Sequence, residues 1–357
     1  MPTPDLLALT AELVDIPSES HAEAAITDHL DHELRALPHL QVERVGHNLV
    51  ARTDLGRATR VVLAGHTDTV PANGNATARV EGEVLWGLGA SDMKGGLAVQ
   101  LALARALSAP AVDVTYVFYA GEEVAAEHNG LGQLVRERPD LVAGDVALLG
   151  EPTGGELEAG CQGTMRVEVR LHGARAHTAR PWMGRNAVHR LGAVLRAVEA
   201  VPERRPVVDG CEFREALQAV AVSGGVAANV VPDLATLTLN RRFAPDRSGA
   251  DALAELEALL RPHLDDGDEV ELVDVAEGAR PGLDHPVLQR LVHHHGLQVS
   301  AKLGWTDVAR FAQLGIPACN LGPGDATLAH QADERVERAA LDRTYEVLLE
   351  VLQAQLP

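Results

Sequence analysis

Three apolar runs, each ending in polar residues, constrain the fold of this chain more than any other feature. The runs are VVLAG at 61–65, VTYVFYAG at 114–121 and VALLG at 146–150, and they lead into HTD, EE and EPT. A segment with helical spacing, Gly95 to Leu107, lies between the first two runs. Apolar strands that alternate with helices are typical of a mainly parallel sheet covered by helices. The sequence therefore predicts such a sheet, with the three polar ends along one edge.

The pattern changes near Gly163. The stretch MRVEVRLHG (165–173) alternates apolar and polar residues with period 2, which is typical of a strand with one covered face. The segments that follow have the order of a split β-α-β unit, which can form an independent small domain. We expect further strands near 218–223, 233–243 and 269–275, and helices near 186–199 and 250–261.

A chain of 357 residues is long enough for one large and one smaller domain. Helical spacing at Leu6 to Val14 and Ala22 to Leu37 precedes the first apolar run, and an amphipathic helix is expected from Ala339 to Leu356. We therefore expect a large α/β domain formed by residues 1–162 and 278–357. Residues 163–277 are expected as an inserted, ferredoxin-like α+β domain.

The composition excludes several classes of partner. The formal net charge of −20 argues against nucleic acid, because binding DNA or RNA needs a cationic surface. No segment has the roughly 18 consecutive apolar residues of a membrane span, and the N-terminus lacks the pattern of a signal peptide. The three cysteines are scattered and odd in number, which is typical of reduced thiols. The sequence thus predicts a cytoplasmic protein with no membrane partner.

The predicted edge of the sheet gathers an unusual set of side chains. His66 and Asp68 are two residues apart in an extended segment, so they would point to the same face. Clustered carboxylates repel one another, and a divalent metal ion is the economical counter-charge. Imidazole and carboxylate together suit zinc or a similar ion, and one shared carboxylate would suit a pair of ions. The full set is His66, Asp68, Asp92, Glu122, Glu123, Glu151 and His330.

These residues lie in motifs that span nearly the whole chain. The motifs are AGHTDTVP, GLGASDMKGG, AGEEV, LGEPT, GARAHTARPWMGRNAVH, ANVVPD, GWTDVARF and LGPGDATLAHQADE. Their wording and order resemble the M20 family of co-catalytic metallopeptidases and amidohydrolases. The resemblance implies a phosphorylase/hydrolase-like catalytic domain of the zinc-exopeptidase type. It also implies that the inserted domain is a lid that dimerises.

The resemblance further implies two divalent metal ions, Zn²⁺ with Co²⁺ as an alternative in one site. The ions would activate a water molecule, and Glu122 would act as the general base. Asp68 would orient His66, and the peptide between Asp92 and Met93 would be cis. The implied metal ligands are His66 and Glu151 for one ion, Glu123 and His330 for the other, and Asp92 as the bridge.

On the inserted domain, the resemblance implies residues that contact the substrate. His177 would stabilise the oxyanion, and it would reach the site of the partner subunit across a homodimer interface. The remaining implied substrate contacts are Asn229, Arg180, Thr306 and Arg242, with Arg241 as an alternative to Arg242.

The motif wording implies a small anionic N-acyl amino acid as the substrate. The implied reaction is hydrolysis of N-succinyl-LL-2,6-diaminopimelate to succinate and LL-2,6-diaminopimelate, a step in lysine and cell-wall precursor synthesis. N-acetylornithine or another N-acyl amino acid is the alternative substrate, with the same ligands. A non-catalytic M20-like binding protein is an alternative of another class, and it would be expected to lack Glu122 or a ligand. All of these positions are intact.

The tract His293 to His295 invites a second metal interpretation. Consecutive residues of a helix point in different directions, so three adjacent histidines do not share one face. The sequence favours a helix surface or a helix end for this tract.

Overall fold

The computed structural model describes residues 4–354, which form two compact units. Within these residues, the larger unit comprises 4–159, 281–300 and 307–354, and the smaller unit comprises 160–280 and 301–306. The sequence did not predict that 301–306 belongs with the smaller unit. Backbone pairing explains this, because the Gln162 N–H donates to the Lys302 carbonyl at 3.2 Å.

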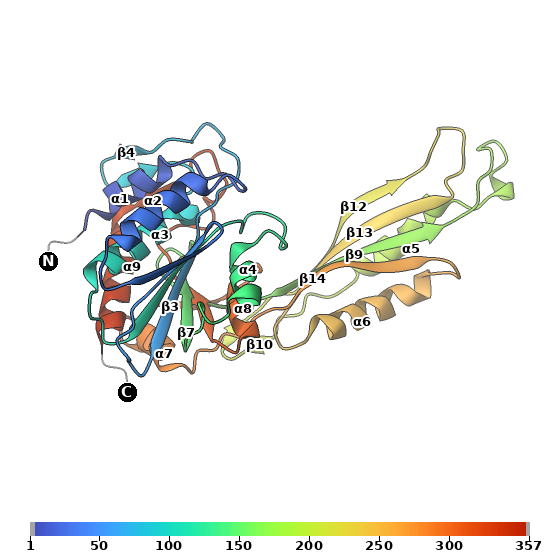
Figure 1. The fold of residues 1–357 in the computed structure, drawn as a ribbon. Coiled ribbons are helices and arrows are strands. Elements are labelled where there is room, and N and C mark those ends of the chain that lie inside the picture. Colours follow the sequence, from blue (N-terminus) through green and yellow to red (C-terminus); the bar gives the residue numbers. More distant parts are fainter. Residues whose placement is uncertain (1–3, 355–357) are drawn as a thin grey trace. The chain divides into compact units, whose positions relative to one another are not determined.

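The larger unit is built on an eight-stranded mixed sheet (Figure 1). Its strand order is β1-β2-β6-β3-β7-β16-β8-β15, and the four strands from β6 to β16 are parallel to one another. Their carboxyl ends therefore share one edge, as predicted. The strands are β1 (Gln41–Val45), β2 (Asn48–Arg52), β3 (Arg60–His66), β6 (Asp113–Tyr119), β7 (Val146–Leu149), β8 (Leu157–Cys161), β15 (Val299–Lys302) and β16 (Ala318–Asn320).

Helices cover both faces of this sheet (Figure 1). On one face α1 (Leu6–Val14), α3 (Gly95–Ala106) and α9 (Arg338–Gln353) pack together, and on the other α4 (Gly130–Glu137) packs against α8 (Val308–Gln313). The expected end of the last helix, Leu356, lies outside the described residues. The remaining elements are α2 (Ala24–Arg35) against β1 and β2, α7 (Pro286–His293) against α9, and a small sheet of β4 (Arg79–Glu81), β5 (Val84–Trp86) and β17 (Arg335–Glu337).

Helix α3 approaches the sheet unusually closely. Every residue from Gly95 to Ala104 is buried, so this part of the helix is surrounded by protein on all sides. A Cβ atom at Gly96 would collide with the carbonyl oxygen of Gly150, which follows β7. Glycine at this position therefore lets the start of α3 lie against the edge of the sheet where the polar residues gather.

The smaller unit is a four-stranded antiparallel sheet with strand order β12-β13-β9-β14. Helices α5 and α6 cover one face, where their apolar side chains pack against those of β9 and β13. This is the predicted split β-α-β order, and together with the parallel sheet it confirms the expected fold class. The elements are β9 (Gly163–His172), α5 (Ala187–Glu199), β12 (Ala216–Gly224), β13 (Leu234–Phe243), α6 (Gly249–Leu260) and β14 (Glu269–Ala276), with a short hairpin of β10 (Val207–Val208) and β11 (Cys211–Glu212).

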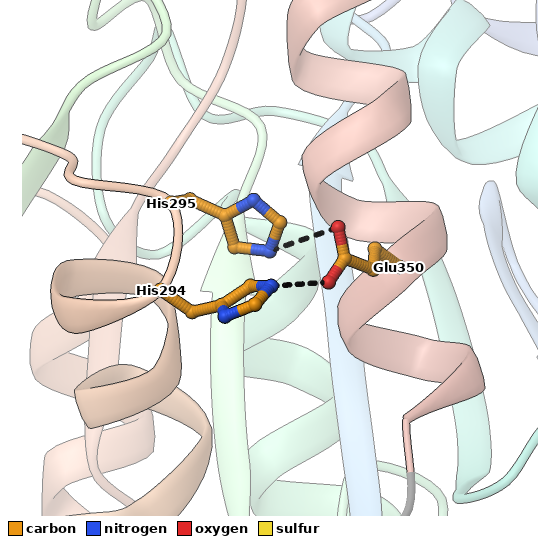
Figure 2. A group of neighbouring side chains, drawn as sticks. All are labelled: His294, His295 and Glu350. Atoms are coloured by element: carbon orange, nitrogen blue, oxygen red, sulfur yellow. Dashed lines mark ion pairs between the residues drawn. The ribbon is translucent and has the colours of Figure 1, made fainter.

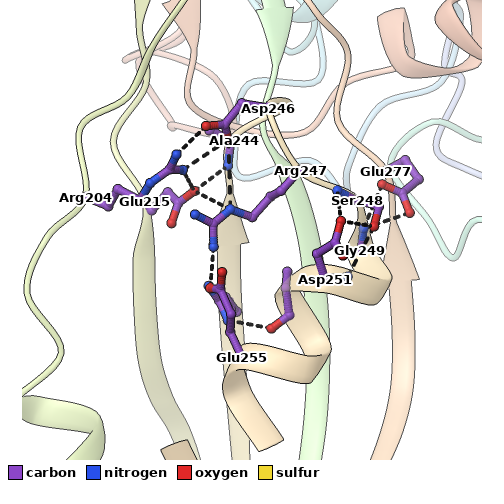
Figure 3. Close-up of polar contacts among 12 residues, drawn as sticks. Arg204, Glu215, Ala244, Asp246, Arg247, Ser248, Gly249, Asp251, Glu255 and Glu277 are labelled. Carbon is purple, nitrogen blue, oxygen red and sulfur yellow. Dashed lines mark hydrogen bonds and ion pairs between the residues drawn. The ribbon is translucent and has the colours of Figure 1, made fainter. Parts of the chain in front are cut away.

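A polar network fastens the loop between β13 and α6 (Figure 3). Glu215 accepts hydrogen bonds from Arg204 at 2.7 Å and from the Ala244 N–H at 3.0 Å. Ser248 caps α6 and exchanges hydrogen bonds with Asp251 in a capping box. The loop is thus tied both to β12 and to the helix that follows it.

Among residues 4–354, no helix combines the length and the apolar character needed to cross a membrane.

Candidate metal centre and catalytic residues

The ends of the parallel strands bring the predicted metal ligands together. His66 is the last residue of β3, Glu122 and Glu123 lie in the turn after β6, and Glu151 follows β7. Asp92 lies in the irregular turn Ala90–Lys94 that leads into α3. His330 comes from the loop before β17 and has a left-handed backbone with φ of 62°. Residues from five separate segments therefore meet at one edge of the sheet.

The contacts within this group are short. His66 Nε2 lies 3.1 Å from Asp92 Oδ1, and His330 Nε2 lies 2.8 Å from Glu123 Oε1. His330 Nε2 is also 3.7 Å from the second oxygen of Asp92, so Asp92 lies between the two imidazoles. One donor atom from each of His66, Asp92 and Glu123 lies within 4.8 Å of the others. Two nitrogen donors around shared carboxylates are a donor set that fits zinc-like divalent ions.

The Asp92–Met93 peptide is cis, which confirms that expectation.

Asp68 is fully buried beneath this group and organises the turn after β6. Its two carboxylate oxygens accept hydrogen bonds from the N–H groups of Glu122, at 3.0 Å, and Glu123, at 3.1 Å. Burial acts to raise its pKa, but the neighbouring His66 ring and the hydrogen bonds from the Glu122 N–H and the Ser20 hydroxyl hold the pKa well below its usual range. Asp68 therefore stays ionised and fixes the backbone that presents both glutamates.

The contact between Asp68 and His66 differs in detail from the expectation. His66 Nδ1 hydrogen-bonds the backbone carbonyl of Asp68 at 3.0 Å, whereas the nearest carboxylate oxygen is 3.6 Å away. Asp68 thus orients the imidazole mainly through its main chain. The Ser20 hydroxyl donates to the Asp68 carboxylate at 2.8 Å. Sequence reasoning missed Ser20, because it lies 48 residues earlier in the chain.

Glu122 has the electrostatic environment of a proton acceptor. Burial raises its pKa well above the usual value, and the carboxylates of Glu151 and Asp307 add to the rise, while His66 opposes it. A carboxylate whose pKa is raised can take a proton from water and later return it. Glu151 is itself 6% exposed, so its negative charge is largely held away from water.

Glu334 is a buried acid that sequence reasoning did not single out. Its Oε1 atom accepts hydrogen bonds from the N–H groups of Ser91 and Asp92, each at 2.9 Å. Burial raises the pKa of Glu334, and the hydrogen bonds from these N–H groups act against that rise. Lys94 is also buried, and the nearby Glu334 carboxylate favours its charged form. The available sequence signal was the acid in HQADE, four residues after His330.

The predicted substrate contacts of the smaller unit fall into two groups. His177, Arg180 and Asn229 lie together on adjacent loops, where the Thr178 N–H donates to the Asn229 carbonyl at 3.0 Å. Arg242 lies at the other end of β13, paired in register with Thr164 at the start of β9. Thr306 lies near that same end, since its carbonyl is 3.8 Å from the sulfur of Cys161.

Comparison with known proteins identifies the family. Residues 62–354 match the model of peptidase family M20/M25/M40. The chain belongs to this family. Members of the M20 family use divalent metal ions, in agreement with the donor set around His66, Asp92 and Glu123.

Two relatives of this M20 chain are similar over nearly their whole length. A Mycobacterium tuberculosis protein named putative succinyl-diaminopimelate desuccinylase DapE is 53% identical over 335 residues, which cover 93% of both chains. A Corynebacterium glutamicum protein named succinyl-diaminopimelate desuccinylase is 46% identical over 337 residues, covering 93% of this chain and 91% of the relative.

Solved structures share the fold of this M20 chain at low sequence identity. An M20 family metallo-carboxypeptidase from Sulfolobus solfataricus matches with a TM-score of 0.78 and 16% identity, covering 98% of this chain and 99% of the other. A tripeptidase from Staphylococcus aureus matches with a TM-score of 0.78 and 22% identity, covering 98% and 97%. These matches agree with the parallel sheet and the separate antiparallel sheet described above.

Proposed function

We propose that this chain hydrolyses N-succinyl-LL-2,6-diaminopimelate to succinate and LL-2,6-diaminopimelate. The observation that carries the proposal is the group of His66, Asp92 and Glu123, whose donor atoms lie within 4.8 Å of one another beside the half-buried Glu122. The names of the two relatives support the choice of substrate.

The metal centre would be held by the residues at the edge of the sheet. His66 and Glu151 would bind one ion, Glu123 and His330 the other, and Asp92 would bridge them. Zn²⁺ is the ion that best suits two imidazoles with carboxylates, and Co²⁺ is the alternative in one site. When bound, such ions make water more acidic and polarise a carbonyl oxygen.

Glu122 would act as the general base. It takes the proton of the attacking water and then delivers it to the nitrogen of the leaving amine. The raised pKa supports both halves of this role, because the protonated form must persist long enough to donate. Asp68 positions Glu122 by accepting the hydrogen bond of its N–H group, at 3.0 Å.

Arg242 is the better candidate for binding a substrate carboxylate than its neighbour Arg241. Arg241 is already used, since it donates to the Ala252 carbonyl at 2.5 Å and to Glu255 at 2.7 Å. Within residues 4–354, no carboxylate forms an ion pair with Arg242, which is only partly exposed. A partly buried guanidinium without a partner is suited to an anionic ligand, and Thr306 would contact the substrate near the same end of the sheet.

His177 and Asn229 would act on the substrate of a partner subunit in a homodimer. Strand β9 runs from Gly163 to His172, and its ten residues span about 30 Å. Arg242 lies at one end of this strand, and His177 and Asn229 lie beyond the other. One small substrate does not span that distance, so a second copy is needed to supply His177, with Arg180 beside it.

Strand β12 offers an edge for this dimer. It pairs with β13 on one side, and Val220 and Val222 are 57% and 55% exposed. An exposed apolar edge strand is a template for pairing with another chain. The smaller unit would thus serve as a lid and dimerisation domain.

We also propose that the protein works in the cytoplasm. Cys161, Cys211 and Cys319 are all buried and form no disulfide within residues 4–354, as expected for a reducing compartment.

Hydrolysis of N-succinyl-LL-diaminopimelate and of N-acetylornithine by the zinc-loaded enzyme tests the function. We expect a clear preference for the succinyl substrate and its loss in Glu122→Ala. A preference for N-acetylornithine would support the proposed site but show that the assigned substrate is wrong. Turnover of neither compound, with the metal ions bound, would favour a binding protein and contradict the proposal.

A double variant, Val220→Lys with Val222→Lys, tests the dimer. We expect a monomer by light scattering and a kcat that falls to the level of His177→Ala, because the monomer lacks the partner's His177. A fully active monomer would contradict the role of His177 in the partner site.

A further inference from the structure

Two histidines and a glutamate converge on the larger unit, away from the site described above (Figure 2). Helix α7 ends at His293, and the rings of His294 and His295 both face Glu350 on α9. His294 Nε2 lies 2.7 Å from one carboxylate oxygen of Glu350, and His295 Nε2 lies 3.8 Å from the other. One donor atom from each residue lies within 4.8 Å of the others.

We infer that His294, His295 and Glu350 form a second, peripheral binding site for a divalent transition-metal ion such as Zn²⁺. Two imidazole nitrogens and one carboxylate oxygen are a recurrent zinc donor set that leaves a fourth position for water. A plain hydrogen bond to Glu350 would need only one histidine. Here both Nε2 atoms point at the same carboxylate, and the two rings stand edge to face with centroids 5.1 Å apart.

The tract lies at the end of α7, as the sequence favoured, and this position lets two of its histidines converge. Adjacent residues inside a helix diverge, so the sequence favoured a simple helix surface or end. His294 still caps the helix with helical backbone angles, but the helix ends there, so His295 is not held to helical spacing and both rings reach the same residue of α9. His293 itself is exposed and takes no part in the cluster.

The surroundings hold the cluster partly in place. His295 has a side chain that is only 10% exposed, whereas His294 and Glu350 are about half exposed. Arg290 Nη2 lies 3.5 Å from Glu350 Oε1, so the arginine helps to orient the carboxylate and leaves Oε2 toward His295. An ion at this position would join the end of α7 to α9 through three ligands.

This cluster is separate from the candidate metal centre. Leu352, two residues after Glu350, accepts a hydrogen bond from the Ala111 N–H, which precedes β6, at 2.9 Å. The cluster therefore lies toward the amino ends of the parallel strands, whereas Glu122 and Glu123 follow their carboxyl ends. The seven residues of β6 put more than about 20 Å between the two edges.

Zinc titration of the enzyme already loaded at its catalytic centre tests the proposal. We expect calorimetry to detect one further Zn²⁺ per chain, and we expect this ion to raise the melting temperature. Mg²⁺ prefers oxygen ligands and should produce neither effect. His294→Ala and Glu350→Gln should each abolish the additional binding while turnover is retained.

His293→Ala is the matched control, because it removes a histidine from the same tract without touching the cluster. It should bind the further Zn²⁺ as the wild type does. Absence of a further ion in the wild type would overturn the proposal. So would a further ion that survives His294→Ala, or one that is lost equally in His293→Ala, since that would mean non-specific binding by the tract. Retained turnover in each variant shows that it is folded.

Discussion

Glu334 holds the backbone of Asp92 in place. Its Oε1 atom accepts the hydrogen bond of the Asp92 N–H at 2.9 Å, and its side chain is buried, with 1% of the residue exposed. The same glutamate lies four residues after His330, in the loop that leads into β17. Glu334 thus links two proposed metal ligands from distant parts of the sequence. It hydrogen-bonds the backbone of Asp92, and it lies in the same loop as His330.

Replacing Glu334 should weaken metal binding by about 10- to 100-fold, which is typical when a group that orients metal ligands is lost. Glu334→Ala removes the acceptor for the N–H groups of Ser91 and Asp92, so kcat should fall with little change in KM. Glu334→Gln keeps a carbonyl acceptor and should partly restore both properties. Zn²⁺ affinity measured by competition with a chromogenic chelator gives a readout independent of turnover.

Glu337→Gln is the control for this experiment, since Glu337 is an exposed acid on the adjoining strand. If Glu334→Ala binds zinc as tightly as this control, Glu334 has no positioning role.

Glu122→Gln should lower kcat by about 10²- to 10⁴-fold, the usual contribution of a general base. The zinc content should stay the same, because Glu122 is not a proposed ligand. Glu127→Gln serves as the comparison, since Glu127 lies in the same loop with its side chain 78% exposed. If Glu122→Gln is nearly as active as Glu127→Gln, Glu122 is not the general base and another residue must take the proton.

Removal of the metal ions by a chelator should abolish hydrolysis and lower the melting temperature. Without counter-charge, the clustered carboxylates of Asp68, Asp92, Glu122, Glu123 and Glu151 repel one another, and the folded state also loses the free energy of binding the ions. Zn²⁺ should restore both activity and melting temperature, and Mg²⁺ should not. A chelated protein with unchanged melting temperature would contradict this account of the site.

Asp268 should make the stability of the smaller unit depend on pH. Burial acts to raise its pKa, but hydrogen bonds from Arg190 and from the Asp265 and His172 N–H groups lower the pKa to about 2. As the pH falls, Asp268 is therefore protonated near pH 4 in the unfolded chain but only at about pH 2 in the folded chain. Stability from Asp268 is complete above that pH and is lost as the pH falls toward 2.

Between pH 5 and pH 3 this loss amounts to about 1 kcal/mol of unfolding free energy by proton linkage. Asp268→Asn should show a correspondingly smaller fall in stability when urea unfolding is compared at the two pH values. Asp266→Asn is the control, because Asp266 is exposed two residues away. An equal pH dependence in Asp268→Asn and wild type would exclude the proposed contribution.

Local pattern was enough to predict most of the fold. The apolar runs at 61–65, 114–121 and 146–150 became β3, β6 and β7, and the polar ends of these strands meet at one edge. The strict alternation of apolar and polar residues from Met165 onward predicted a strand with one covered face, and β9 has this burial pattern. A short stretch of sequence is enough to show such patterns, because buried positions recur every two residues in a strand and about every 3.6 residues in a helix.

The sequence by itself determined the strand and helix order, and the types of side chain available at the edge of the sheet. Only the tertiary structure decided that Asp68 accepts the N–H groups of Glu122 and Glu123, and that Glu334 accepts that of Asp92. It also decided that both histidines after α7 face Glu350. The physical reason is that a buried polar group must find a hydrogen-bond partner wherever packing places one. That partner depends on the register between distant segments, which no local pattern contains.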